Sequence, residues 1–392
     1  MGAFFTRLLG CCAALLLALT ATSGKVEAEP AKGEPLLIGV HYDAAKQASY
    51  YSLGQKSVFD VFVDQLNANG GIHGRPIKLL YEDDELNPVV AATKVEKLAG
   101  ENVLMIISIS GSATGLAAQK KGEELKIPVG SPGNFLEPLT TVPPKHEYFR
   151  FAMRDSVGAK ALIKYFRAHF KDPKIAVVRD ATETGLLLSD SYIKLLKDAG
   201  FAIVATEQIT PGSTDVTAQA MHVKESKADL VMLAGASVPD MANYVKTHFL
   251  VGDKTPLFGN YLLSTPPFNK LAGEGANGLI YTDMLDPARP EGKKIEATLV
   301  AALGDKAKDA PFMIGAWEFI RWVGDALDRA GNTPTRDSLR DALENTKDWP
   351  TALGPAGTKV TFSPDRHDLF FSGDEVVLRE IANGQYGPAL KQ

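Results

Sequence analysis

Cysteine, surplus basic charge and long hydrophobic runs are all scarce in this chain of 392 residues. Its two cysteines, Cys11 and Cys12, both lie near the N-terminus, so a chain that loses this segment has none. That excludes a cysteine nucleophile, a Cys-ligated zinc, an iron–sulfur cluster and a disulfide from the remainder. The formal net charge of −5 leaves no surplus of Lys and Arg to neutralise phosphates, so we expect no nucleic-acid partner. Beyond the N-terminal segment, no apolar run reaches the ~18 residues of a membrane-spanning helix.

Catalytic motifs are also missing. The chain has no Gly-x-Ser-x-Gly elbow, no P-loop, no Gly-x-Gly-x-x-Gly turn opening a helix and no His-Glu-x-x-His pair. The acidic run at 82–85 lacks the spacing of a calcium loop, and its alternative interpretation is a solvated strand end with a helix N-cap. We therefore expect no catalytic residues, no cofactor and no metal, although a metal site assembled only in space stays open.

The N-terminus has the form of an export signal. Arg7 is followed by an apolar stretch from Leu8 to Ala21, and Val26-Glu27-Ala28 fits the small-residue pattern before a cleavage point. We expect residues 1–28 to be removed, with cleavage near Ala28 and a periplasmic mature protein. An uncleaved anchor and lipidation at Cys11 are the alternatives.

The remaining chain alternates apolar strands with amphipathic helices. Strands are predicted at 36–40, 77–81, 103–109 and 127–130, with helices at 50–67, 88–99 and 115–125 between them. The same alternation repeats from residue 156 to 258. This pattern predicts an α/β protein with two doubly wound, parallel-sheet lobes. Three helices without intervening strands (291–303, 311–330 and 335–345) need a sheet to cover, and the first lobe is the candidate. Strands are expected again at 359–362, 369–371 and 374–381.

Loops at the carboxyl ends of strands are where open α/β sheets bind ligands. The loop 110–115 (Ser-Gly-Ser-Ala-Thr-Gly) offers hydroxyls and backbone N–H groups at a helix start, which suits a carboxylate or a phosphate. Simple helix capping is the alternative. In the loop 131–135, glycine permits close approach of a ligand, and Phe135 is either an apolar wall or part of the core.

At these residues the chain resembles the type I periplasmic solute-binding proteins of the branched-chain amino acid ABC-transporter class. The strongest match is the stretch 67–77 (Asn-Ala-Asn-Gly-Gly-Ile-His-Gly-Arg-Pro-Ile), followed by Glu82-Asp83-Asp84; further matches lie at 38–40, 110–114, 127–132 and 278–280. The resemblance covers residues 36–385 and specifies the fold and the class, not the ligand.

The resemblance implies two lobes joined by a three-strand hinge that close on a ligand. It places 36–152 with 284–352 in lobe 1 and 153–283 with 353–392 in lobe 2, with crossovers near 150–154, 281–284 and 352–357. It also implies a monomeric receptor that delivers a small-molecule carboxylate to an inner-membrane ABC permease.

When the family's ligand-binding residues are matched to this chain one by one, several positions differ from those that the resemblance implies for an amino-acid binder. Gly111 stands where the family has a Ser, with Ser112 beside it, and Phe135 and Thr184 replace a Thr and a Tyr. Tyr261 stands where an acidic residue pairs with the ligand ammonium. A buried ammonium without a carboxylate partner is costly, so an apolar or aromatic acid without an amino group is the expected ligand.

The candidate ligand-binding residues share positions in loops at strand ends or on the helix that follows the first strand. They are Tyr51, Leu53, Gly111, Ser112, Thr114, Gly133, Asn134, Phe135, Thr184, Ser237 and Tyr261, with Tyr50 and Leu136 as further wall candidates.

Three alternatives remain open. Asp180, Glu183 or Asp240 from neighbouring loops would supply the missing carboxylate if the ligand is a branched-chain or other amino acid. The same fold also serves ligand-sensing modules that feed a receptor. An enzyme would need a nucleophile–base pair, and the sequence offers none.

Overall fold

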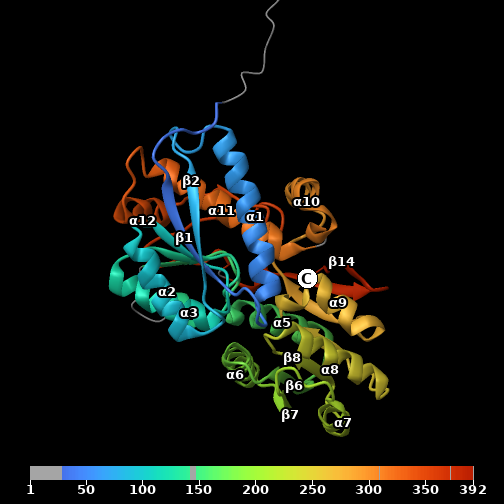
Figure 1. Ribbon diagram of the computed structural model, residues 1–392. Coiled ribbons are helices and arrows are strands. Elements are labelled where there is room, and N and C mark those ends of the chain that lie inside the picture. The colour runs from blue at the N-terminus through green and yellow to red at the C-terminus, as the bar shows by residue number, and fades with distance from the viewer. Residues whose placement is uncertain (1–28, 142–146, 309, 371, 392) are drawn as a thin grey trace, which may run out of the picture.

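The structure, a computed structural model, describes residues 29–141, 147–308, 310–370 and 372–391. The predicted signal segment lies outside these residues. Two α/β lobes stand one above the other, with the chain from β1 to β5 (36–150) in the upper one (Figure 1). No helix of the described residues has the length and apolar character needed to cross a bilayer.

The first lobe is built on a five-stranded parallel sheet in the order β2-β1-β3-β4-β5. Its strands are β1 (Leu36–Tyr42), β2 (Ile77–Asp83), β3 (Met105–Ser108), β4 (Val129–Ser131) and β5 (Tyr148–Arg150). The helices between them are α1 (Ser49–Ala68), α2 (Pro88–Gly100), α3 (Ser112–Leu125) and α4 (Pro138–Thr141). Every residue of β3 is buried, as expected for a central strand covered on both faces.

The second lobe repeats this order with β7-β6-β8-β9-β10 and extends it with two antiparallel strands, β13 and β14. Its strands are β6 (Lys174–Asp180), β7 (Ala202–Ile209), β8 (Leu230–Leu233), β9 (Leu257–Gly259), β10 (Ile280–Asp283), β13 (Val377–Ala382) and β14 (Gln385–Ala389). Its helices are α5 (Asp155–His169), α6 (Glu183–Asp198), α7 (Thr217–Glu225), α8 (Val238–Leu250), η1 (Tyr261–Leu263), α9 (Pro266–Ala272) and η2 (Gly273–Ala276).

Local sequence signals account for several of these boundaries. Asn87 caps α2 by accepting hydrogen bonds from the Val89 and Val90 amides, and Pro88 occupies the first helical position. After α1, Gly70 and Gly71 take positive φ angles of 98° and 63°, which end the helix and turn the chain toward β2. Such signals are why this part of the sequence predicts its elements well.

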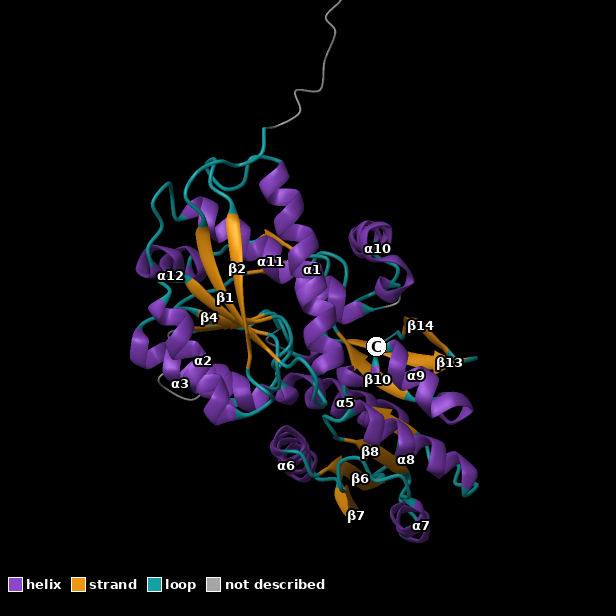
Figure 2. Cartoon of the chain, in the orientation of Figure 1, coloured by secondary structure: helices purple, strands orange, loops and turns teal. Residues whose placement is uncertain are grey.

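The chain then returns to the first lobe, as expected from its strandless helices. The elements of this return are α10 (Pro290–Leu303), η3 (Gly304–Ala307), α11 (Pro311–Arg329), α12 (Arg336–Glu344) and a small hairpin of β11 (Trp349–Pro350) and β12 (Lys359–Val360). The next element, η4 (Gly373–Glu375), packs against α5 of the second lobe. Phe62 of α1 packs edge-on against Trp317 of α11, with ring centroids 5.1 Å apart. Figure 2 shows α1 and α11 on one side of the first sheet and α2 and α3 on the other.

Three of the differences between the structure and the sequence expectation concern the site and the crossovers. Helix α3 begins at Ser112 rather than at Gly115, because Gly111 serves as its N-cap. Residues 369–370 form no strand; Leu369 instead donates its backbone N–H to the Arg150 carbonyl beside β5. The chain also leaves the first lobe later than the expected crossover at 352–357, since Phe362 packs against Trp322 at 5.1 Å.

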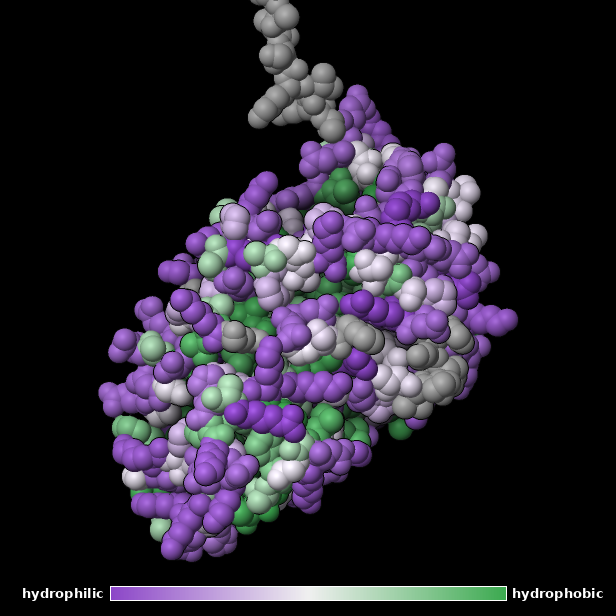
Figure 3. All heavy atoms as spheres, turned by 180° about the vertical axis from the view of Figure 1, so that it is seen from behind, coloured by the Kyte–Doolittle hydropathy of each residue, from purple (hydrophilic) through white to green (hydrophobic). Residues whose placement is uncertain are grey.

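The face opposite to Figure 1 is covered mostly by hydrophilic residues, with hydrophobic ones in smaller groups between them (Figure 3). The largest buried hydrophobic cluster runs from the first sheet across the crossovers into the second lobe. The two lobes thus share packing at their junction, and the loops at the carboxyl ends of both sheets meet there.

Candidate functional site

A cavity of about 260 Å³ lies between the lobes at the carboxyl ends of β1, β3, β4, β6, β8 and β9. The first sheet has the order 2-1-3-4-5, in which the strand order reverses between β1 and β3, and ligands bind at such switch points. The second sheet repeats the reversal between β6 and β8. Both switch points open into the same cavity.

Ten of the eleven candidate ligand-binding residues line this cavity: Tyr51, Gly111, Ser112, Thr114, Gly133, Asn134, Phe135, Thr184, Ser237 and Tyr261. Leu53 does not, and 44% of its surface is exposed. The reason is helical geometry, because two residues turn α1 by more than half a revolution away from Tyr51. Tyr50 and Leu136 also lie outside the lining.

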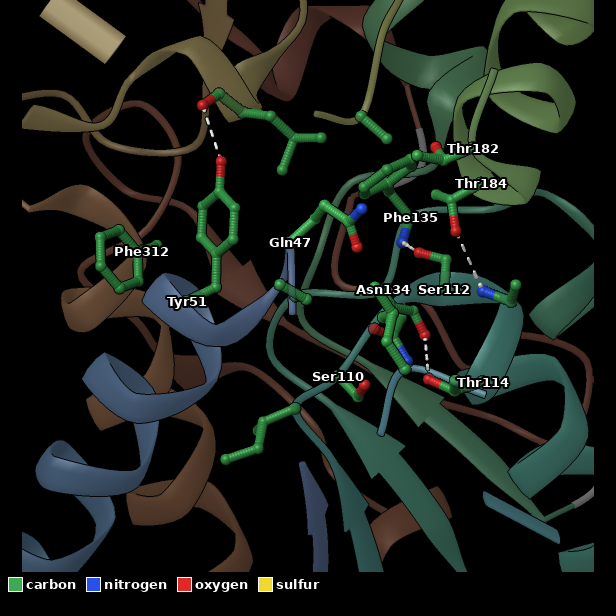
Figure 4. A pocket seen from close by; sticks show the side chains of 18 of the residues that line it. Gln47, Tyr51, Ser110, Ser112, Thr114, Asn134, Phe135, Thr182, Thr184 and Phe312 are labelled. Carbon is green, nitrogen blue, oxygen red and sulfur yellow. Dashed lines mark hydrogen bonds between the residues drawn. The ribbon is translucent and has the colours of Figure 1, made fainter. Parts of the chain in front are cut away.

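One end of the cavity is the N-terminus of α3. Ser112 Oγ accepts a hydrogen bond from the Phe135 amide at 3.1 Å, which leaves its own proton for a ligand acceptor. Thr114 Oγ1 donates to the Gly111 carbonyl at 2.6 Å, so its proton is used within the helix start. Thr184 from the second lobe accepts the Ala113 N–H at 3.3 Å (Figure 4). Hydroxyls from both lobes therefore meet at one helix end, where the helix dipole favours an anion.

The opposite side of the cavity is aromatic. Tyr51 of α1 and Phe312 of α11 lie together there, with ring centroids 5.5 Å apart (Figure 4). A second aromatic pair lies beside the α3 start, where Phe135, whose amide donates to Ser112 Oγ (Figure 4), meets Tyr261 edge-on at 5.7 Å across the lobe boundary. Phe135 is both a wall of the cavity and a member of the buried core, so the two interpretations of this residue hold together.

Two tyrosines connect the lobes directly. The Tyr51 hydroxyl donates to the Leu262 carbonyl at 2.9 Å, and the Tyr261 hydroxyl donates to the Gly133 carbonyl at 2.5 Å. Burial raises the pKa of both phenols above the ordinary value, so each stays a protonated donor at neutral pH. The structure is therefore in a closed arrangement held by contacts across the cavity.

The floor of the site is an ordered polar network rather than a solvated strand end. Asp84, fully buried, accepts hydrogen bonds from His41 Nδ1 at 2.7 Å, Ser110 Oγ at 2.8 Å and the Leu86 amide at 2.9 Å. In the second lobe Asp180 accepts the amides of Thr182 and Ser237 and ties the β6 and β8 loops together. These carboxylates position loops, so Asp180 is not available as the ammonium partner.

Of the other two carboxylates considered from the sequence, Glu183 lines the cavity and Asp240 does not. Glu183 is the one charged side chain among the lining residues that the structure describes, and it is exposed. Asp240 is buried and accepts the Gly212 amide at 2.9 Å. Within the described residues, no group of three or more His, Cys, Asp or Glu side chains is arranged to hold a metal ion.

The sequence missed several lining residues, among them Gln47, Gln55, Met284 and Phe312. Phe312 carries no local signal, since it comes to Tyr51 only through the return of the chain to the first lobe. Met284 had the same signal as the other loops, because it directly follows β10. Gln55 had a usable signal. It is a polar residue in the apolar stripe of α1, one turn from Tyr51 and in line with the buried Val58 and Phe59.

The comparisons with known proteins agree with this geometry. The family profile described as "Periplasmic binding protein" matches residues 35–370. The Leu/Ile/Val-binding protein BraC3 of Rhizobium johnstonii is 26% identical over 300 residues, covering 76% of this chain and 80% of that protein. Leu/Ile/Val-binding protein homolog 2 of Brucella abortus is 25% identical over 355 residues, covering 88% and 90%.

Solved structures show the same fold. A type 1 periplasmic binding protein from Bordetella pertussis has a TM-score of 0.79 at 22% identity, covering 91% of this chain and all of that one. LivJ from Streptococcus pneumoniae, solved with isoleucine, has a TM-score of 0.78 at 19% identity, covering 92% and 100%. The chain thus belongs to the periplasmic binding protein family, with the type I fold and with branched-chain amino acid-binding proteins among its relatives, and it is a solute-binding protein rather than an enzyme.

Proposed function

We propose that this protein is the exported receptor of an ABC importer and clamps a small apolar or aromatic carboxylate that lacks an amino group. The observation that carries the proposal is the division of the cavity. The start of α3, with the Ser112 proton and backbone amides, suits the carboxylate, whereas Tyr51 and Phe312 on the other side suit an apolar body. Tyr261 lies on the second-lobe wall where an ammonium would need an acid.

The second candidate ligand is an amino acid, with Glu183 as its ammonium partner. Glu183 lines the cavity one residue from Thr184, which contacts the α3 start, and the relatives are leucine, isoleucine and valine binders by name. Its exposure argues against this role, because an ammonium enclosed by lobe closure is best paired with a buried carboxylate.

A thermal-shift panel distinguishes between the two candidate ligand classes. The chain without residues 1–28 is unfolded in denaturant, dialysed and refolded to strip carried-over ligand, then melted with branched-chain and aromatic amino acids and with benzoate, phenylacetate and short aliphatic acids. A bound ligand raises the melting temperature by mass action. We expect shifts with acids that lack an amine.

A shift with leucine or valine alone would overturn the ligand class and leave the receptor function standing. In that case Glu183→Gln is the decisive variant, because it removes the proposed ammonium partner and should abolish the shift. Under the proposal, the same variant leaves the shift with aromatic acids unchanged, since no contact of that ligand uses the Glu183 carboxylate.

A further inference from the structure

Gln55 is a buried amide on the wall of the cavity. Its residue is 3% exposed, and it lies on α1 one helical turn after Tyr51. Its neighbours on the buried stripe of the helix, Val58 and Phe59, are fully covered and apolar. An uncharged polar side chain in this stripe has to be explained by what its amide contacts.

Within the described residues, the buried Oε1 of Gln55 has no hydrogen-bond donor. The other polar groups beside the cavity floor do have partners: Ser52 donates to the Ile109 carbonyl, and Asn134 donates to Ser108 and Tyr148. A buried acceptor that stays unpaired is destabilising, so native sites normally satisfy it. Gln55 therefore differs from Ser52 and Asn134 in being a cavity-lining residue whose buried amide oxygen has no partner within the described residues.

The fold makes room for this amide at Gly133. A Cβ atom at that position would approach Gln55 Nε2 to 3.0 Å, which is closer than nearly all real Cβ contacts. Glycine thus lets the 131–135 loop pass against the amide. The Gly133 carbonyl is at the same time the acceptor for Tyr261 from the second lobe. Gln55 thus lies where α1 and the 131–135 loop meet, next to the residue that Tyr261 of the second lobe contacts.

We infer that Gln55 is a specificity-determining residue that selects ligands with a neutral hydroxyl placed beside the 131–135 loop. The inference rests on the proposed function, in which the carboxylate occupies the start of α3. In Figure 4 that helix start, with Ser112 and Thr114, faces Tyr51 of α1 across the cavity. A hydroxyl both donates and accepts, so it matches the amide oxygen and the amide nitrogen of Gln55. A site built to bind a hydroxyl rejects the analogue that lacks it, because the amide is then left unpaired.

Matched ligand pairs test this directly by calorimetry. The pairs are 4-hydroxybenzoate with benzoate, 4-hydroxyphenylacetate with phenylacetate, tyrosine with phenylalanine, and threonine with valine. We expect the wild-type protein to bind the hydroxyl member of at least one pair at least tenfold more tightly. Gln55→Met, which keeps the length of the side chain and removes its hydrogen-bonding atoms, should reduce that ratio to about one. Gln55→Glu, which keeps acceptor oxygens, should retain a preference for the hydroxyl.

The control is Gln65→Met, because Gln65 lies exposed on the same helix away from the cavity and should leave every ratio unchanged. Equal affinities within every bound pair, as expected if water alone satisfies the amide, would overturn the inference, as would a preference that survives in Gln55→Met. If only the amino-acid pairs bind, the proposed ligand class is refuted. The affinity ratio within those pairs then still tests the role of Gln55. Binding of no acid refutes both.

Discussion

Ser112 and Thr114 carry similar hydroxyls two residues apart, yet their hydrogen bonds differ. Ser112 accepts from the Phe135 amide and keeps its proton for another acceptor, whereas Thr114 gives its proton to the Gly111 carbonyl. Both are buried at the start of α3. Only the first hydroxyl is therefore placed to donate to a ligand carboxylate.

Ser112→Ala should weaken binding of an acid ligand by about 10- to 100-fold, because a hydrogen bond to a charged group contributes ~1.5–3 kcal/mol. Thr114→Val is the matched control and should change affinity much less, since its proton is not offered to the cavity. Calorimetric titration of both variants with the acid found by thermal shift measures the difference. Equal losses in the two variants would mean that the hydroxyls act only by shaping the helix start.

At the residue scale, ten of the eleven candidates lie in the cavity lining because loops after parallel strands must meet at one edge. The sequence placed Gly111, Ser112 and Phe135 by that rule together with the family resemblance. It was wrong about Leu53, because one side of a helix cannot be assigned without knowing which stripe is buried. It missed Phe312, because proximity across the return of the chain leaves no local pattern.

At the scale of elements, buried charged groups fix the crossover from β5 to α5. Arg150, fully buried, donates to Asp368 at 2.6 Å and to the Leu136 carbonyl at 2.8 Å. Burial alone would raise the pKa of Asp368, but Arg150, the Thr140 hydroxyl and Arg154 bring it below the ordinary value. This pair stays ionised and fixes the crossover to residues 367–369.

Asp155, at the first turn of α5, behaves in the opposite way. Burial, and then the neighbouring Glu137 carboxylate, raise its pKa to about 8 from an ordinary value of 3.8, against the opposing effect of Arg150. A carboxyl whose pKa is higher in the folded state binds more protons than in the unfolded state at intermediate pH. Its stabilising contribution is complete below about pH 4 and is lost as the pH rises through 8.

Asp155→Asn should therefore flatten the fall in the free energy of unfolding between about pH 4 and pH 8, by on the order of a few kcal/mol. Denaturant titrations of both proteins at several pH values measure this. Part of the slope should persist in the variant, since burial also raises the pKa of Glu147 to about 7. Parallel profiles for the two proteins would show that Asp155 ionises as freely in the folded protein as in the unfolded one.

The sequence predicted the elements of both lobes well and their junction less well. The buried parallel strands have unambiguous apolar runs, so β1 and β3 lie where the pattern places them, within two residues at each end. Residues 359–370 are stabilised by contacts with Arg150 and Trp322 rather than by their own pattern. Such segments depend on partners distant in sequence, and their conformation cannot be predicted from local pattern.

At the scale of the whole molecule, closure depends on a few contacts that cross the cavity. The Tyr51–Leu262 hydrogen bond joins α1 to η1, and the Tyr261–Gly133 bond joins the same second-lobe segment to the loop after β4. These bonds form only when the lobes are together, so they favour the closed state at the expense of the open one.

Tyr51→Phe should lower ligand affinity by about 3- to 10-fold, because a neutral hydrogen bond of ~0.5–1.5 kcal/mol is lost from the closed state alone. Tyr50→Phe is the control, since Tyr50 is adjacent, partly exposed and outside the cavity lining. Titration with the identified ligand, together with small-angle scattering with and without it, separates affinity from closure. An unchanged affinity in Tyr51→Phe would contradict a role for this bond in closure.

The return of the chain to the first lobe also has a consequence for the order of events during synthesis. The His73 ring lies 3.0 Å from the Asp328 carbonyl, a residue 255 positions further along, and Phe62 packs on Trp317 of the same late helix. A chain that emerges from one end cannot complete the core of its first lobe until the whole second-lobe segment from α5 to β10 has also emerged. Until then, the apolar face of α1 that packs on α11 has no partner.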